Sequence, residues 1–228
     1  MKGFFCVLII LIMRVVQNVF NKKSSILIPA DSASFLKYIM VQNFFAAFFS
    51  LVIFLFDKPS VPDAKTVLIS SLSGIFLASC TILNLLGMKH CSIALCSMFS
   101  TAGLLVPCVA GIFLFHEPMN IIQWVAIIPL FFSAYLLMDT SGPQPSFSFQ
   151  SILILVGSLL ANGMTMVMQK LFTYSIPNGN VSAFSFFTFF IPALLSGAIL
   201  LCSPSHAQKK QPLNRKLLPS AAILAFSV

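Results

Sequence analysis

Residues 83–138 read "LNLLGMKHCSIALCSMFSTAGLLVPCVAGIFLFHEPMNIIQWVAIIPLFFSAYLLM", and two short polar breaks, near Lys89 and near Glu117, divide them into long apolar runs. A bilayer core about 30 Å thick is crossed by about 20 apolar residues in a helix, at a rise of 1.5 Å per residue. The runs are apolar on every face, whereas a transmembrane β-strand would alternate over about ten residues. This stretch therefore predicts consecutive transmembrane helices joined by short turns.

The rest of the chain has the same character. Its 228 residues are 58% hydrophobic and 8% charged, whereas a soluble domain carries roughly 25% charged residues. The composition predicts an all-α, polytopic transmembrane helical bundle, with helices at 3–21, 34–56, 66–87, 91–115, 120–138, 151–172 and 181–202. A further apolar stretch begins at Leu217 and supplies only about 12 residues, too few to span a bilayer.

Other classes find little support in the residues. No small-residue cleavage pattern follows the first 20 residues, so we expect no cleaved signal peptide. The six cysteines include no CxxC pair, and His116-Glu117 lacks the second histidine of a HExxH zinc motif. We therefore expect no enzyme activity, no metal and no cofactor. The net charge of +8 comes from cations at span ends, which indicates membrane topology rather than nucleic-acid binding.

Two parts of the chain repeat one pattern. Gln17, Val19 and Phe20 align with Gln169, Leu171 and Phe172, and a serine-containing loop and a Phe-rich helix follow each set. If the unit is five helices, the odd number inverts the second copy relative to the first, as in many secondary transporters. We assign residues 1–140 to the first repeat and 150–228 to an incomplete second repeat. The alternative is that two Phe-rich spans resemble each other by chance.

Within residues 83–138, Pro107, Gly111, Glu117 and Gln123 occur in an order that resembles the EamA-like members of the drug/metabolite transporter superfamily. The resemblance implies a ten-helix carrier built from two inverted five-helix halves, with the substrate path between them. It also implies a bacterial plasma membrane, by analogy with bacterial members. The sequence stops early in the eighth helix of that pattern. The expected partners are the lipid bilayer and a small-molecule substrate, with a homodimer as an open alternative.

Polar residues inside the expected spans are the candidates for a substrate path. Arg14, Gln17 and Asn18 share one face of the first helix, and Asn162, Thr165 and Gln169 share one face of the sixth. Further candidates lie on the second and third helices: Gln42, Asn43, Ser73, Cys80 and Asn84. The alternative role for the amides is hydrogen bonding between helices. We expect structural roles for Pro107, Gly111 and Glu117, as a kink, a close-packing position and a helix cap.

Arg14 carries the functional prediction. A charge in mid-bilayer costs at least about 2.5 to 3.5 kcal/mol, and no acidic residue falls inside an expected span to pair with it. We expect Arg14 to face the path, held by Gln17, Asn18 and Asn84, unless it reaches the headgroups instead. The lack of an embedded carboxylate disfavours cationic drugs and favours a neutral or anionic metabolite. The alternatives are a nucleotide-sugar or sugar-phosphate transporter and a truncated membrane protein without transport activity.

Overall fold

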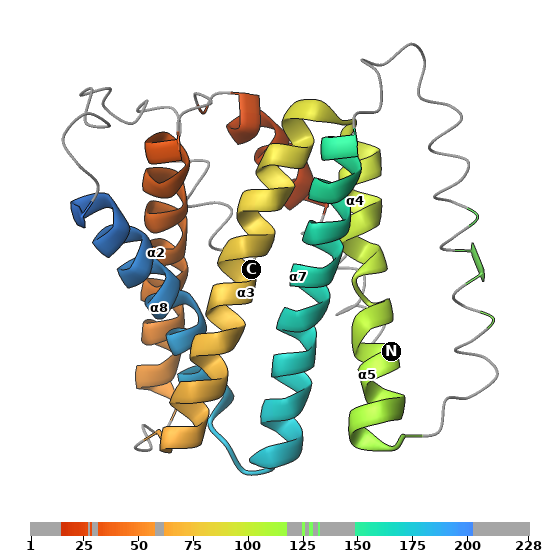
Figure 1. The fold of residues 1–228 in the computed structure, drawn as a ribbon. Helices are drawn as coiled ribbons and strands as arrows, with labels where there is room; N and C mark the ends of the chain where they lie inside the picture. The colour runs from red at the N-terminus through yellow and green to blue at the C-terminus, as the bar shows by residue number, and fades with distance from the viewer. Residues whose placement is uncertain are drawn as a thin grey trace. The chain divides into compact units, whose positions relative to one another are not determined.

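The computed structural model describes residues 15–26, 28, 32–57, 62–117, 125, 128–129, 132 and 149–202. Those residues form helices and turns, with no strand among them. After a helical segment over residues 15–26 come the six helices labelled in Figure 1: α2 (Ser32–Phe56), α3 (Ala64–His90), α4 (Ile93–Ala102), α5 (Leu105–Phe115), α7 (Phe149–Ser175) and α8 (Val181–Cys202).

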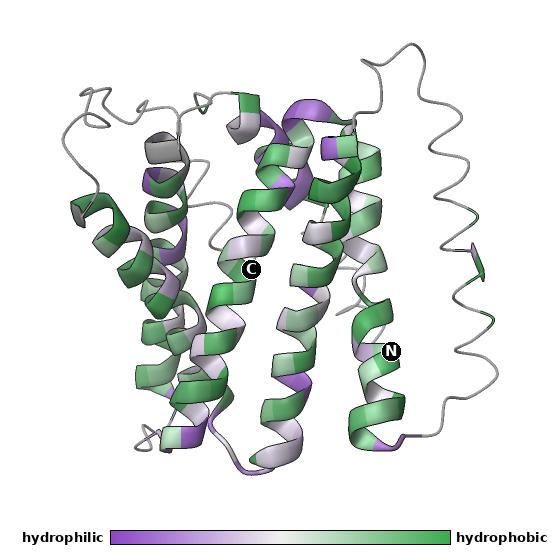
Figure 2. Ribbon diagram, in the orientation of Figure 1, coloured by the Kyte–Doolittle hydropathy of each residue, from purple (hydrophilic) through white to green (hydrophobic). Residues whose placement is uncertain are grey.

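Five described stretches are long and apolar enough to cross a membrane, with α4 and α5 counted together as one span. Figure 2 shows that hydrophobic residues dominate these helices. The described part of the chain is therefore all-helical, and its membrane-length apolar helices are those of an integral membrane protein, as the composition predicts. Arg14 and Gln123 lie outside the described residues, as does most of the predicted helix at 120–138.

Two predicted boundaries are wrong. The first helix does not end at residue 21, because the described helix continues through residue 26. Residues 21–25 are polar, so the hydropathy pattern did not predict that the helix continues through them. The predicted helix at 91–115 is not continuous, because a turn at Gly103 and Leu104 separates α4 from α5. The apolar pattern runs through this turn without a polar residue, so hydropathy alone could not locate it.

The described contacts divide the chain into two units, which we call the α2–α8 unit (residues 1–61 and 180–228) and the α3–α7 unit (residues 62–179). In the α2–α8 unit the two named helices pack antiparallel. The Ser182 hydroxyl at the start of α8 donates to Asp57 Oδ2 after the end of α2, over 2.9 Å. Further along, Gly197 lies against Met40. The two helices line a partly open, apolar hollow of about 730 Å³, whose wall includes Phe44 and Phe190.

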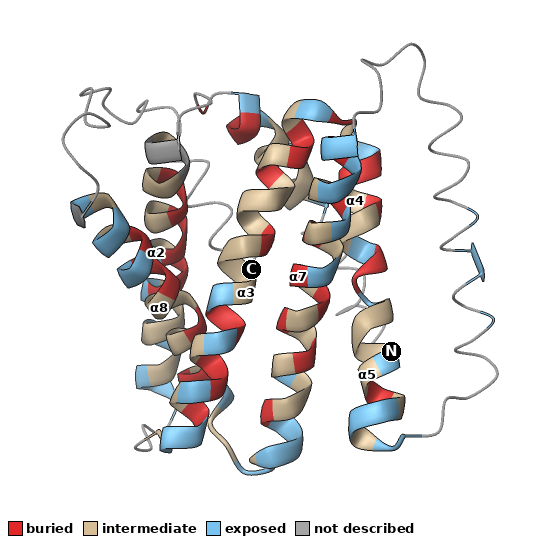
Figure 3. Ribbon diagram, viewed as in Figure 1, coloured by how far each residue is buried: buried red, intermediate tan, exposed pale blue. Residues whose placement is uncertain are grey.

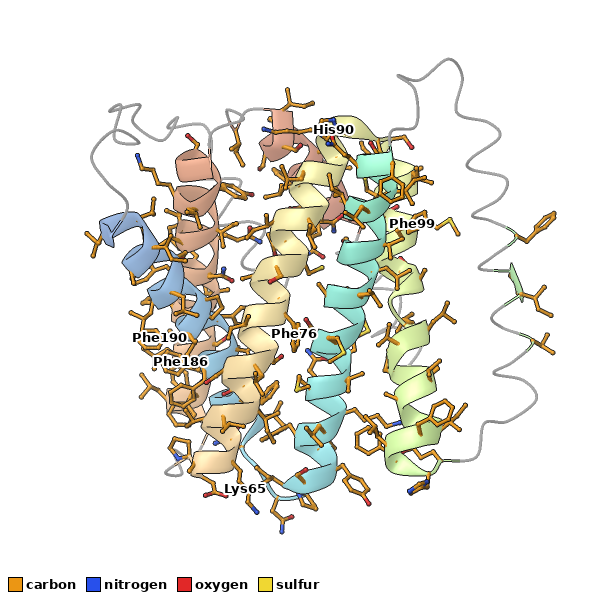
Figure 4. All side chains as sticks on the ribbon, viewed as in Figure 1. Lys65, Phe76, His90, Phe99, Phe186 and Phe190 are labelled. Atoms are coloured by element: carbon orange, nitrogen blue, oxygen red, sulfur yellow. The ribbon has the colours of Figure 1, made fainter. Side chains whose placement is uncertain are left out.

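In the α3–α7 unit, α3 and α7 are also antiparallel. Gly87 near the end of α3 lies against Ile154 and Leu155, whereas Gly157 contacts Leu83. In contrast, α4 and α5 run parallel to α7, since Gly103 lies beside Asn162 and Gly111 lies beside Lys170. Figure 4 marks the two ends of α3 with Lys65 and His90. A cluster of Met88, Cys91, Leu95, Cys96 and Leu155 fills the end of this unit where α3 turns into α4.

The turn from α3 to α4 is short because Ser92 begins α4 as its N-cap. The Ser92 hydroxyl accepts a hydrogen bond from the Leu95 backbone N–H over 3.3 Å, which satisfies one of the free donors at a helix start. Elsewhere, hydroxyls donate to carbonyls of the preceding turn of their own helix, as Thr81, Thr101 and Thr188 do. This pairing lets serine and threonine lie in a membrane helix without an outside partner.

Candidate functional site

The interruption of the span Ile93–Phe115 is a short stretch of 3₁₀ geometry. Gly103 has φ −53° and ψ −22°, and Leu104 has φ −58° and ψ −21°, both typical of a 3₁₀ turn. The N–H groups of Gly103, Leu104 and Val106 each bond to the carbonyl three residues earlier. Pro107 follows without an N–H, so it cannot bond to the Gly103 carbonyl as an α-helix would require. The regular pattern resumes where Cys108 bonds to Leu104.

Asn162 of α7 joins this break from the neighbouring helix. Its Nδ2 donates to the Ser100 carbonyl over 2.6 Å, across a sequence separation of 62. In a continuous helix that carbonyl would accept from Leu104, whose N–H bonds to Thr101 instead. The amide therefore adds a bond to a carbonyl that the break leaves without its regular helical donor.

The backbones of α5 and α7 approach closely at the same level. A β-carbon added to Gly163 would lie 2.4 Å from Val106 Cβ and 2.7 Å from the Gly103 carbonyl oxygen. A β-carbon added to Gly103 would lie 2.9 Å from the Leu159 carbonyl oxygen. Glycine is thus required on both helices, and the pair forms a small-residue crossing typical of membrane helices. Break, crossing and cross-helix amide together make one structural element, which we call the Gly103 hinge (Ser100 to Pro107, with Asn162 and Gly163).

One end of the same unit carries a charged contact. After α5 the chain turns through His116, in the left-handed conformation (φ 51°, ψ 33°), and the Glu117 N–H bonds back to the Gly111 carbonyl. The Glu117 carboxylate forms an ion pair with Lys170 of α7. The lysine ammonium also lies 5.1 Å from the centre of the Phe115 ring, a cation–π contact. These contacts fix the end of α5 to α7.

The α2–α8 unit has a separate group of buried and half-buried polar side chains, which we call the polar seam: Asn21, Ser24 and Ser25 from residues 15–26, and Tyr38, Gln42 and Asn43 from α2. Ser24, Ser25 and Tyr38 have no exposed surface, and Gln42 and Asn43 are buried. Ser24 and Tyr38 lie beside each other. Figure 3 shows the buried stripe along α2 to which the last three belong.

Three oxygens of the polar seam are unusual. Asn21 Oδ1, the Tyr38 hydroxyl and Gln42 Oε1 are buried and have no hydrogen bond of good geometry to any described residue. An unpaired buried polar atom costs about 1 to 3 kcal/mol, and the bilayer core offers no water to relieve it. Unpaired atoms of this kind call for an explanation beyond packing.

The structure places the sequence-predicted candidates in different settings. Gln17 and Asn18 are half-buried in the segment 15–26, and Asn84 is half-buried on α3. On α7, Asn162 bonds to Ser100, Thr165 is buried and donates to the Ala161 carbonyl of its own helix, and Gln169 is exposed. The predicted structural residues Pro107 and Gly111 lie on α5, and Glu117 lies just after it.

Several residues of these sites were missed by the sequence reasoning. Asn21 and Ser24 follow Gln17 by four and seven residues and so share its helix face. The sequence pattern did not indicate this, because the predicted helix ends at residue 21. Lys170 was counted only as a cation at a span end, and nothing in the linear sequence pairs it with Glu117, 53 positions away. For Tyr38, the only sequence feature that indicates a place in this group is its position four residues before Gln42, on the same helix face.

Comparisons with protein-family models, with curated proteins and with solved structures find no significant match. The geometry of the described residues must therefore support any assignment of function. That geometry offers a break within a membrane span and a buried group of uncharged polar side chains. Among the described residues, no cluster of histidine, cysteine or carboxylate side chains could hold a metal ion.

Proposed function

We propose that this protein is a secondary transporter that moves a small neutral or anionic metabolite across a membrane by alternating access. The observation that carries the proposal is the Gly103 hinge. A carrier must let parts of its bundle pivot about the substrate site, and interrupted membrane helices are a recurring means to this end. Mid-helix 3₁₀ turns often mark such hinges.

The contacts around the hinge suit a pivot rather than a rigid joint. At the Gly103–Gly163 crossing neither glycine has a side chain to interlock with the other helix, which leaves the two backbones freer to rotate against each other. The single amide from Asn162 to Ser100 is worth roughly 0.6 to 2 kcal/mol in a membrane bundle, which is small enough to break and re-form during a cycle. The exposed ion pair between Glu117 and Lys170 at the far end of α5 is a contact of similar or smaller free energy, so it would not hold α5 rigid against α7.

The direction of the helices is consistent with an inverted repeat. Because α5 and α7 run parallel, Glu117 and Phe149 belong to opposite membrane faces. The predicted span at 120–138 would return the chain between them, and the first and sixth predicted spans would then run in opposite directions, as inverted halves require. Membership of the EamA-like family and a bacterial plasma membrane remain part of the proposal, supported by the motif in residues 83–138.

Counterflow into proteoliposomes tests the function. Purified protein should exchange at least one labelled compound from a panel of amino acids, sugars and nucleotide sugars. Pro107→Ala supplies the missing N–H at the hinge and should reduce the exchange rate severalfold without loss of folded protein. Pro177→Ala, in the exposed turn before α8, is the matched control and should exchange at the wild-type rate. Folded protein that exchanges no member of the panel would contradict the proposal.

A further inference from the structure

We propose that the polar seam is a binding site for a small neutral ligand that bears hydroxyl or amide groups. The site lies apart from the Gly103 hinge, and its role as a substrate site rests on the proposed transport function. The evidence is a set of buried oxygens: among the described residues, the amide oxygens of Asn21 and Gln42 have no partner, and the Tyr38 hydroxyl has only Ser24 beside it.

The three residues lie on facing surfaces of two neighbouring helical segments. Tyr38 and Gln42 are one turn apart on α2, and Asn21 and Ser24 are one turn apart on residues 15–26. The contact between Ser24 and Tyr38 joins the two segments. Counted along each segment, Asn21 lies one turn before Ser24 and Gln42 lies one turn after Tyr38, so the polar positions continue on both segments beyond that contact.

The burial of these atoms indicates a closed site. Tyr38 is fully buried and Gln42 is 8% exposed, so a ligand enters only when residues 15–26 move away from α2. The free energy lost in leaving the amide oxygens of Asn21 and Gln42 unpaired favours this opening whenever a ligand or water can supply hydrogen-bond donors. Polar atoms inside a membrane protein lower its stability when they are unpaired, and such residues usually have a functional role.

The chemistry of the seam selects a neutral ligand. All six of its side chains are uncharged, and neither residues 15–26 nor α2 contains an acidic residue, so a cation would find no counter-charge. None of the six side chains is cationic, so an anion would find no counter-charge within the seam either. Lys22 and Lys37 are half-buried on the same segments, and Lys23 is exposed. Amides and hydroxyls both donate and accept, which matches the hydroxyl and amide groups of a neutral ligand.

Cysteine accessibility tests whether the seam opens. In a variant whose six cysteines are replaced, Asn21→Cys and Gln42→Cys should react with a membrane-impermeant thiosulfonate, since the reacting thiolate forms in water and not in hydrocarbon. Ile53→Cys, on an exposed face of α2, is the control for a lipid-facing thiol. We expect the seam positions to react at least about tenfold faster than this control. If the seam positions react no faster than Ile53→Cys in either vesicle orientation, the proposed site is wrong.

Protection from labelling tests the ligand class. The probes are a monosaccharide, a linear polyol, a primary amide and citrate, each at the same ionic strength. At least one neutral probe should slow the labelling of Gln42→Cys, and citrate should not. Tyr38→Phe, added to that variant, removes only a hydroxyl and should raise the half-protecting concentration about fivefold. Protection by citrate alone, by none of the probes, or without dependence on Tyr38 would overturn the proposal.

The two proposals fail separately. A seam that labels and is protected, in a protein without counterflow, would leave the binding site and remove transport. Counterflow in a protein whose seam never labels would leave transport and remove the seam as the site.

Discussion

Gly163 lies where α7 and α5 touch through their backbones. A β-carbon at this position would fall 2.4 Å from Val106, within the β-branched part of that side chain. Neither Val106 Cβ nor the Gly103 carbonyl can move without shifting α5. The residue therefore decides how closely the two helices pack.

We predict that Gly163→Ala lowers the free energy of unfolding in detergent by about 1 to 3 kcal/mol, as overpacking of a close contact does. Gly157→Ala is the matched control on the same helix. Its β-carbon would meet the end of the flexible Leu83 side chain at 3.2 Å, so the change should be small. Thermal unfolding of the two variants measures the difference, and equal midpoints would contradict the packing described.

For Asn162, the sequence predicts the helix face on which it lies but not the atom to which it bonds. Its spacing from Thr165 and Gln169 predicts a shared polar face, and the alternative role of bonding to another helix was open. Its partner, the Ser100 carbonyl, is a backbone atom with no sequence signature, and only the fold brings it within 2.6 Å. Arg14, the strongest functional prediction, lies outside the described residues and stays a prediction.

For Asn162→Leu we predict a loss of about 0.6 to 1.7 kcal/mol in unfolding free energy, the range for hydrogen bonds between membrane helices. The Ser100 carbonyl keeps its bond from Gly103, so the loss should stay modest. Gln169→Leu, at an exposed position of the same helix, should change stability little. Substitution of the Ser100 side chain leaves its backbone carbonyl in place, so a double-mutant cycle cannot isolate this bond. Calorimetry on Asn162→Leu and Gln169→Leu is therefore the measurement. Equal losses of unfolding free energy in the two variants would show that the bond contributes nothing.

At the scale of the element, α4 and α5 show why hydropathy predicts a span but not its interior. The run from Ile93 to Phe115 is apolar enough to cross the membrane, and this much was predicted. The turn at Gly103 depends on the missing N–H of Pro107 and on the approach of α7. Proline is tolerated in many membrane helices with only a bend, so its presence alone did not predict a break.

Pro107→Ala should make this stretch more regular. The new N–H can bond to the Gly103 carbonyl, and the amides of residues 103–108 should then exchange with deuterium more slowly. Hydrogen-exchange mass spectrometry of the peptide that contains the break measures this, with a peptide from the middle of α3 as the internal reference. Unchanged or faster exchange at the break would argue against the role assigned to Pro107.

The contact between the end of α5 and α7 should behave as a surface ion pair. Lys170 and Glu117 have 31% and 56% of their side chains exposed, so we expect a coupling free energy of about 0.2 to 1 kcal/mol at low salt. It should shrink as salt is added. A double-mutant cycle with Glu117→Gln and Lys170→Gln measures it, and Lys65→Gln serves as a single-charge control. Coupling that is absent at low salt would exclude the ion pair as a stabilising contact.

At the scale of the whole molecule, composition predicts the membrane class because charge and hydropathy are properties of the entire chain. The directions of the helices follow from contacts far apart in sequence, such as Gly111 with Lys170. The α3 and α7 helices have 27 residues each, about 40 Å at 1.5 Å per residue. Each is long enough to place its two ends at opposite faces of a bilayer.

We predict that Ser92→Cys and Gln150→Cys label from one side of the membrane, and Asp63→Cys and Asn178→Cys from the other. All four positions belong to the α3–α7 unit, and the variants are made one at a time without the native cysteines. An impermeant maleimide applied to vesicles of known orientation gives the readout. Labelling of Gln150→Cys and Asn178→Cys from the same side would contradict the span assigned to α7.

The hydrogen bond between Asn162 and Ser100 has a consequence for biosynthesis. Its partners are 62 residues apart, and a ribosome adding about 5–20 residues per second needs roughly 3 to 12 s to make that length. For most of this interval α4 and α5 are already synthesised while the helix that completes their packing is not. The nascent Gly103 turn is therefore exposed to the insertion machinery, and its final geometry is set only when α7 is released beside it.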